Sequence, residues 1–410
     1  MEIITILTIM SVVIILGFFS EMTFRKTNIP DVLLLILIGI GVGSVFQLIE
    51  ATDLQAGSSL FTTLALIFIL FQGALSIDIK QLIESLSDAL KITLLGFLCT
   101  VIVVTVVCLL FRLDFLTSLL VAVILSGTSS AVIIPLVKRV TLKPKYGVVI
   151  TLESAITDVL CIVGAVTIIG IIQTGNAQAS TIFNTLLSSF ALALVVGAVV
   201  GLLWIVILHK FKDVARSYLV TVAIAIGLYA FVQSDFVDAS GAIAVLAFGL
   251  VVGNSKLLLK LLLHSKQQDV VINNVLSTHA KTFYGEISFF VKTFFFVYLG
   301  IIIDFSNLIV FMYALVLVVV IYLIRPLAVK YAFKESLEDK DRTYLEILIP
   351  KGLAAAVLAQ LAVQAQIPQA SMVVGMILGV VLFSIIVTSI AVFFAEKNKF
   401  KGVFATFKRY

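Results

Sequence analysis

Five ionisable side chains interrupt long apolar runs in this sequence of 410 residues. They are Glu153, Asp158, Lys292, Arg325 and Lys351. A charge among apolar residues is costly to bury, so each one is a candidate for function or for a buried ion pair. Glu153 and Asp158 are five residues apart on one predicted helix, which places them about 140° apart around its axis. They therefore do not form a carboxylate pair.

The two acids define two polar stripes on that helix, because residues four apart share a face. Ser154 and Asp158 form one stripe. Removal from water favours the protonated form of a carboxylate, so Asp158 can hold a proton or a small cation, and either occupant excludes the other. This is the minimum chemistry for exchange. The alternative is that Lys351 or Arg325 neutralises Asp158 in a buried ion pair.

Glu153 and Thr157 form the second stripe, and for Glu153 we expect a permanent partner. The guanidinium of Arg325 suits this role because it can bind both carboxylate oxygens at once. We therefore predict a structural ion pair. Lys351 directly follows Pro350, where its charge can compensate the carbonyl end of an interrupted helix. We predict that Pro350 and Lys351 mark a structural helix break.

The elements that position these residues are membrane-spanning helices. Apolar residues make up 61% of the chain and charged residues 12%, against roughly 45–50% and about 25% in soluble domains. A soluble fold is excluded, and the basic residues form no patch suited to nucleic acid. Thirteen helices are predicted, at residues 2–20, 31–50, 58–77, 89–111, 115–137, 147–173, 181–208, 215–233, 239–254, 283–303, 308–330, 344–366 and 369–395.

The basic residues predict the orientation of these helices. Of the 28 Lys and Arg residues, 24 lie in or beside the loops after odd-numbered helices or in the C-terminal tail. Only Arg112 lies in the loops after even-numbered helices. Because cytoplasmic loops retain positive charge, we predict a multi-pass cell-membrane protein whose N-terminus is outside and whose C-terminus is cytoplasmic.

Two of the predicted helices carry sequences that interrupt a helix. Helix five contains Ser126–Ser130 ahead of Pro135, and helix twelve contains Pro350–Gly352. These helices run in opposite directions, so we predict inverted repeats, helices one to six and eight to thirteen, whose broken helices cross near the midplane. Gln72 on helix three and Lys292 on helix ten lie near midspan and are expected to line an aqueous cavity. The alternative for Lys292 is that its long side chain extends to the membrane interface.

Several segments resemble a known family. Glu153–Asp158 reads Glu-Ser-Ala-Ile-Thr-Asp, which resembles the Glu-Ser-x-x-Asn-Asp signature of NhaP-type sodium/proton antiporters in the cation:proton antiporter superfamily. The resemblance spans nearly the whole chain. The further segments that agree are Phe71–Asp78, Ser240–Ala244, Phe294–Gly300, Arg325–Leu327 and Pro350–Leu353.

The resemblance implies a homodimer in the lipid bilayer in which each chain, residues 1–410, is one transporter domain. A six-helix core, helices four to six and eleven to thirteen, would move against a scaffold and dimer region that includes a linker helix. The implied ranges are 89–173 and 308–395 for the core, 1–88 and 174–307 for the scaffold, and 396–410 for a short cytoplasmic tail.

The resemblance also implies the site residues. Asp158 would bind the cation or the proton, and Ser154 and Thr128 would complete the coordination, with Ser129 and Thr157 beside them. Thr157 stands where the family has Asn, and Ser129 where many members have Asp. Gln72 likewise stands where many members have Glu. Fewer charged oxygens favour a weaker or larger monovalent cation, so potassium competes with sodium as the cargo.

The expected function is antiport of a monovalent cation, with sodium first, against protons. A single carboxylate predicts one cation for one proton and no net charge moved. A potassium/proton antiporter of the same fold and a passive cation channel are the alternatives. We expect no enzyme activity and no cofactor beyond the transported ions, since the sequence has no Gly-rich phosphate loop and no zinc-binding helix.

Overall fold

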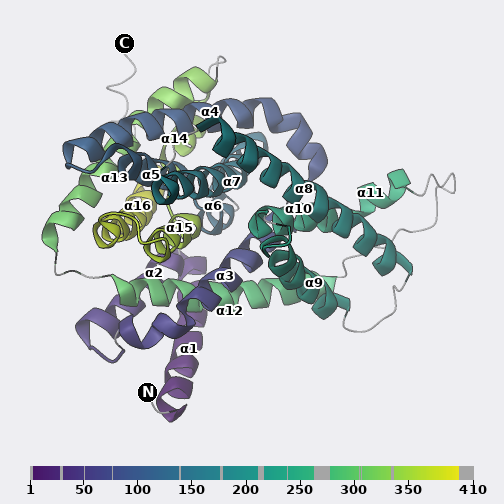
Figure 1. The fold of residues 1–410 in the computed structure, drawn as a ribbon, viewed down its shortest axis with the longest axis horizontal. Helices are drawn as coiled ribbons and strands as arrows, with labels where there is room; N and C mark the ends of the chain where they lie inside the picture. The colour runs from purple at the N-terminus through teal and green to yellow at the C-terminus, as the bar shows by residue number, and fades with distance from the viewer. Residues whose placement is uncertain are drawn as a thin grey trace. The chain divides into compact units, whose positions relative to one another are not determined.

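A computed structural model provides the fold. It describes residues 3–27, 31–49, 51–75, 77–137, 140–175, 179–210, 217–237, 239–262, 278–303, 305, 307–333 and 337–396. Within these ranges every regular element is a helix (Figure 1). The predicted cytoplasmic tail, apart from Glu396, lies outside the described residues.

Figure 1 shows the helices in their order along the chain. In chain order they are α1 (Ile3–Thr27), α2 (Asp31–Ile40), the π-helix η1 (Gly41–Val45), α3 (Ala51–Leu75), α4 (Ile79–Leu110), α5 (Phe115–Ser126), α6 (Ser130–Val137), α7 (Pro144–Thr174), α8 (Ala179–Lys210), α9 (Ser217–Val232), α10 (Gly241–Gly253), α11 (Ser255–Leu262), α12 (Thr278–Ile302), α13 (Leu308–Ala332), α14 (Asp339–Ile347), α15 (Leu353–Gln364) and α16 (Ala370–Glu396).

Each predicted hydrophobic range overlaps a helix or a pair of helices in the structure. Among the described residues, six helices are long and apolar enough to cross a membrane, and shorter apolar helices accompany them. The all-helical membrane fold is therefore confirmed, whereas the number of thirteen spans stays a prediction.

The start of the fourth predicted helix, at residue 89, is wrong by ten residues, because α4 already begins at Ile79. The charged residues of its first turns indicated a loop, but the helix accommodates them at its surface. Asp88, for example, forms an ion pair with Lys145 at the start of α7, with the Nζ and Oδ2 atoms 2.8 Å apart.

The structure contains both predicted interruptions. Helix five consists of α5 and α6, and residues 127–129 between them are not helical. Helix twelve consists of α14 and α15, and residues 348–352 between them, which include Pro350, are not helical. Pro135 lies inside α6 rather than at the break, and Pro326 lies inside the continuous helix α13. Glycine and polar residues therefore interrupt helix five.

The ends of these helices follow from local chemistry. Asp114 caps the start of α5, where its side chain accepts a hydrogen bond of 2.9 Å from the backbone N–H of Thr117. Pro144 is the first residue of α7. A backbone N–H at this position has no partner within the helix, so the N–H that proline lacks costs no helical hydrogen bond. Gly175 ends α7 with a φ of 63°, and its N–H donates to the carbonyl of Ile171.

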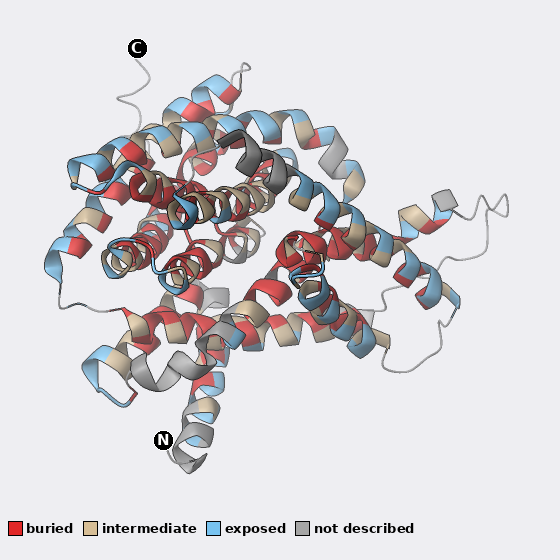
Figure 2. Ribbon diagram, in the orientation of Figure 1, coloured by how far each residue is buried: buried red, intermediate tan, exposed pale blue. Residues whose placement is uncertain are grey.

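The chain divides into two compact units. Residues 1–56, 84–176 and 293–410 form the first, and residues 57–83 and 177–292 form the second. In the first unit α5 packs on α7, while α13 and α15 pack on α16. Helices α5 and α16 are buried along most of their length (Figure 2).

In the second unit α10 packs on α8 and α9. Small residues permit the close approach of α8 and α10. A Cβ added at Gly197 on α8 would collide with the carbonyl oxygen of Ala244 on α10 and lie 2.9 Å from its carbonyl carbon. The backbones of these two helices therefore touch at this point, as in other membrane helix pairs with small residues at the contact.

Replacing Gly197 by alanine should destabilise the packing of α8 on α10. Overpacking of this kind costs about 1–3 kcal/mol, so we expect the Gly197→Ala variant to have a lower melting temperature in detergent. The matched control is Gly227→Ala on α9, because an added Cβ there has nothing within 4 Å. Equal melting temperatures for the two variants would contradict the close approach of these helices.

Candidate functional site

The two broken helices meet at their breaks. The backbone N–H of Ser129, between α5 and α6, donates a hydrogen bond of 2.8 Å to the carbonyl of Pro350, between α14 and α15. Gly352 lies against the same segment, because a Cβ added there would collide with Ser129 Oγ and lie 2.6 Å from Ser129 Cβ. A residue without a side chain is therefore required at position 352 for this contact.

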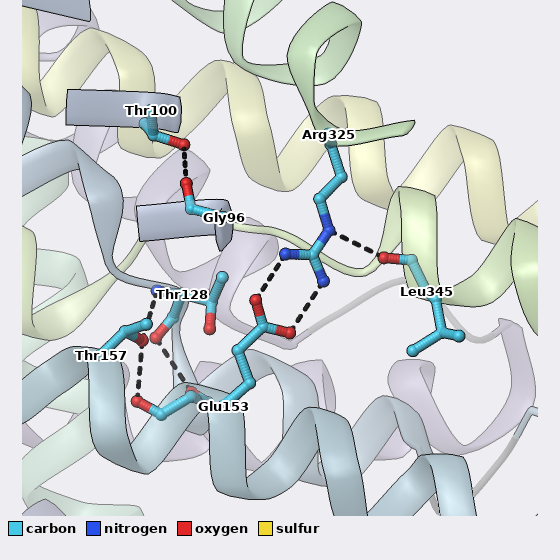
Figure 3. Close-up of polar contacts among 8 residues, drawn as sticks. Gly96, Thr100, Thr128, Glu153, Thr157, Arg325 and Leu345 are labelled. Atoms are coloured by element: carbon cyan, nitrogen blue, oxygen red, sulfur yellow. Dashed lines mark hydrogen bonds and ion pairs between the residues drawn. The ribbon is translucent and has the colours of Figure 1, made fainter. Parts of the chain in front are cut away.

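Side chains of α7 satisfy the backbone of the break in helix five. Thr157 Oγ1 accepts a hydrogen bond of 3.2 Å from the N–H of Thr128, and Ser154 Oγ donates one of 2.9 Å to the Thr128 carbonyl (Figure 3). Thr157 Oγ1 in turn donates to the Ser154 carbonyl at 3.0 Å. These bonds replace helical bonds that the break loses, which is essential for a backbone segment away from water.

Asp158 lies on α7 beside this segment and is only 5% exposed. Its Oδ2 accepts a hydrogen bond of 3.0 Å from Ser130 Oγ, the first residue of α6. Within the part of the chain that the structure describes, neither Lys351 nor Arg325 forms an ion pair with this carboxylate. Asp158 is therefore a buried acid whose hydrogen-bond partner is a neutral hydroxyl group.

Glu153 and Arg325 form a buried ion pair between α7 and α13. Arg325 Nη2 donates to Glu153 Oε2 at 2.7 Å, and Nη1 donates to Oε1 (Figure 3). The guanidinium also donates through Nε to the carbonyl of Leu345, at 2.9 Å, near the end of α14. Both side chains are at most 5% exposed. Arg325 thus joins three helices and satisfies a carbonyl close to the break in helix twelve.

Lys351 is 2% exposed and lies within the break of helix twelve. Its backbone N–H donates a hydrogen bond of 2.9 Å to Ser384 Oγ on α16. Ser384 Oγ donates in turn to the carbonyl of Val381 at 3.0 Å. The break in helix twelve is therefore held by α16, as the break in helix five is held by α7.

A small polar cavity lies between the ion pair and the two breaks. Its volume is about 10 Å³, and Thr128, Glu153, Arg325 and Lys351 are among the residues that line it. This volume is close to the minimum that holds one water molecule. Thr128 Oγ1 is buried and has no hydrogen-bond partner among the described residues, so it is a polar group that such a water can satisfy.

The structure brings together Asp158, Ser154, Thr128 and Thr157 of the predicted site residues. Ser129 also lies there, but its Oγ lies against Gly352. The residue that donates a hydrogen bond to Asp158 is Ser130, the residue after Ser129, and the sequence did not predict it as a site residue. Which of two adjacent serines faces the acid depends on the residue at which α6 begins, and helical periodicity does not define that point.

Gln72 and Lys292 belong to the second unit. Gln72 Nε2 lies 3.8 Å from the position of a Cβ added at Gly285, so this amide faces α12 within that unit. Lys292 lies about two helical turns further along α12 and is partly buried. Their role in lining a cavity stays a prediction.

Replacing Arg325 by alanine should destabilise the fold, because it leaves the charge of Glu153 buried without its partner. Loss of one member of a buried pair costs about 3–5 kcal/mol, so we expect a much lower melting temperature for Arg325→Ala. Replacing both residues by methionine should restore most of the loss. The control is Lys91→Ala, which removes a half-exposed cation 3.7 Å from Asp88 and should change stability by less than about 1 kcal/mol. An Arg325→Ala variant as stable as the parent would contradict the pairing.

Comparison with known proteins places the chain among ion exchangers. The family described as "Sodium/hydrogen exchanger, transmembrane" matches residues 8–396. "Probable Na(+)/H(+) antiporter 2" of Methanocaldococcus jannaschii is 27% identical over 376 residues, which cover 85% of this chain and 85% of that protein. "K(+)/H(+) antiporter NhaP2" of a Shewanella species is 27% identical over 371 residues, which cover 88% of this chain and 61% of that protein.

A solved structure has the same fold. The sodium proton antiporter MjNhaP1 of Methanocaldococcus jannaschii at pH 8 superimposes with a TM-score of 0.78 over 95% of this chain and 100% of that chain. The sequence identity of the two proteins is 23%, so this likeness concerns the fold alone.

Proposed function

We propose, from the premise that this chain belongs to the sodium/hydrogen exchanger family, that Asp158 is the carboxylate through which cation and proton are exchanged. The chain is a secondary antiporter of a multi-pass membrane fold. The observation that carries the role of Asp158 is its environment. It is 5% exposed, it accepts a hydrogen bond from Ser130, and no described cation neutralises it.

The exchange step follows from this environment. A deprotonated Asp158 attracts a monovalent cation, and a proton that arrives on the same carboxylate removes the charge that holds the cation. Ser154 Oγ and the Thr128 carbonyl are the proposed further ligands. Each already takes part in their mutual hydrogen bond, yet the hydroxyl oxygen and the carbonyl oxygen each keep lone-pair capacity for a cation. Thr157, whose hydroxyl supports this segment, is a neighbouring member of the site.

The proposed cargo is sodium. The identity between this chain and an archaeal relative named for sodium and proton antiport supports it. Potassium is the competing cargo, supported by the relatives named for potassium and proton antiport and by the scarcity of acidic residues at the site. A passive cation channel is the alternative from another class, and coupled fluxes of cation and proton distinguish an exchanger from it.

Alternating access is proposed to arise from movement of a six-helix core against a scaffold. Supporting this, the two core ranges, 89–173 and 308–395, both fall within the first compact unit. A homodimer in the cell membrane, with the N-terminus outside and the C-terminus in the cytoplasm, completes the proposal. The distribution of basic residues supports the orientation.

Asp158→Asn should abolish exchange, because an amide neither binds a proton in this pH range nor attracts a cation as a carboxylate does. The measurement is the pH change that sodium evokes in everted vesicles, compared with lithium, potassium and rubidium. The matched control is Asp235→Asn, which neutralises an exposed aspartate outside this site and should leave exchange unchanged. Normal exchange by a folded Asp158→Asn protein would refute the role of this residue.

Exchange should not depend on the membrane potential, because one cation and one proton share a single carboxylate. A cycle that moved one net charge would feel about 2.3 kcal/mol per 100 mV. Purified protein in proteoliposomes should therefore transport at equal rates under imposed potentials of either sign. A rate that follows the potential would show that the stoichiometry is not one to one.

A further inference from the structure

We propose that Ser130 is a further cation ligand and positioning residue, whose hydroxyl donates to Asp158 Oδ2 when no ion is bound and offers a lone pair to the cation when one binds. This inference rests on the proposed role of Asp158. Its starting point is the contact of 3.0 Å between Ser130 Oγ and Asp158 Oδ2. In this geometry the hydroxyl donates, since an ionised carboxylate has no hydrogen to give.

Ser130 lies at the exposed edge of the site. It is partly exposed, whereas Asp158, Ser154, Thr157 and Thr128 are each at most 5% exposed. It is also the first residue of α6, directly after the break in helix five. Ser130 thus lies at the positive end of the α6 dipole and also supplies a hydroxyl donor, and both favour a negative charge on Asp158.

A hydroxyl group can serve all three states of the carboxylate without movement of the backbone. With no ion bound, Ser130 donates to Oδ2. When Oδ2 is protonated, the acid donates and Ser130 Oγ accepts. When a cation binds, the O–H bond rotates away and a lone pair of Oγ faces the cation. One donor and two acceptor positions on a freely rotating hydroxyl are sufficient for each arrangement.

Among the described residues, the charged and titratable groups near Asp158 do not duplicate its contact with Ser130. On α7 they are Glu153 and Cys161, on α13 Arg325, and at the break in helix twelve Lys351. Glu153 and Arg325 bind each other, and Cys161 Sγ donates to the carbonyl of Val123. Lys351 makes no ion pair with Asp158 in the part of the chain described. Removal of the Ser130 hydroxyl therefore acts on Asp158 directly.

The test is Ser130→Ala in purified full-length protein, with sodium as the probe. Loss of the Ser130 donor disfavours the ionised form of Asp158, so protons should compete with sodium for this carboxylate up to a higher pH. We expect the pH of half-maximal exchange to rise by about one unit, since a hydrogen bond to a charged group is worth about that shift. The apparent KM for sodium should rise severalfold because one ligand oxygen is lost, whereas the melting temperature without sodium should change only slightly.

Two further variants separate this role from a structural one. Ser130→Thr keeps the hydroxyl and should restore the parent pH profile, whereas Ser130→Cys keeps the size with a weaker donor and should shift the profile in the same direction by less. If Ser130→Ala does not fold, the Thr and Cys variants carry the test. The control for loss of a buried hydroxyl is Ser389→Ala on α16, whose Oγ donates to its own helix at Ile385.

A Ser130→Ala or Ser130→Cys protein with the parent pH profile and KM would overturn the inference. If Asp158→Asn is inactive in the same assay, the proposed function then stands while the role of Ser130 fails. An active Asp158→Asn protein would instead overturn the proposed function, and with it this inference.

Discussion

A backbone that leaves the helical conformation inside a membrane must find hydrogen-bond partners within the protein, and the structure depends on this constraint. The breaks at residues 127–129 and 348–352 expose N–H and carbonyl groups that no lipid can satisfy. Ser154 and Thr157 bind those of the first break, and Ser384 binds one of the second. Ser154 and Thr157 lie on the same helix as Asp158, so the groups that repair the first break belong to the proposed cation site as well.

The buried ion pair follows from the same constraint. Arg325 binds Glu153 with two N–H groups and still satisfies the carbonyl of Leu345 near a helix end. A lysine would bring its charge to a single point and could not bind both carboxylate oxygens in this planar manner. The separation of Glu153 and Asp158 around α7 lets Glu153 pair with Arg325 while Asp158, the proposed ion-binding acid, faces Ser130 instead.

The sequence predicts the helices and both interruptions well, because apolar runs and Gly- or Pro-containing segments each have a local physical cause. It predicts less about contacts that depend on register. Pro135 drew attention to helix five, yet the chain leaves the helix at Gly127–Ser129, where glycine and small polar residues precede α6. Ser130 was missed for the same reason, since the turn that directs it to Asp158 is defined by packing against α7. The hydrogen bond from Lys351 to Ser384 spans 33 residues and has no sequence signature.

The contact of Gly352 with Ser129 limits how this site can change in evolution or by design. The size of the residue at position 352 is restricted, rather than its charge, because even one methyl group there would push the two helix breaks apart. A larger residue at position 352 would displace Ser129, whose N–H binds the Pro350 carbonyl. In the proposed function, a change of cargo is therefore expected to involve the hydroxyl side chains of α7 and the first residue of α6 rather than Gly352.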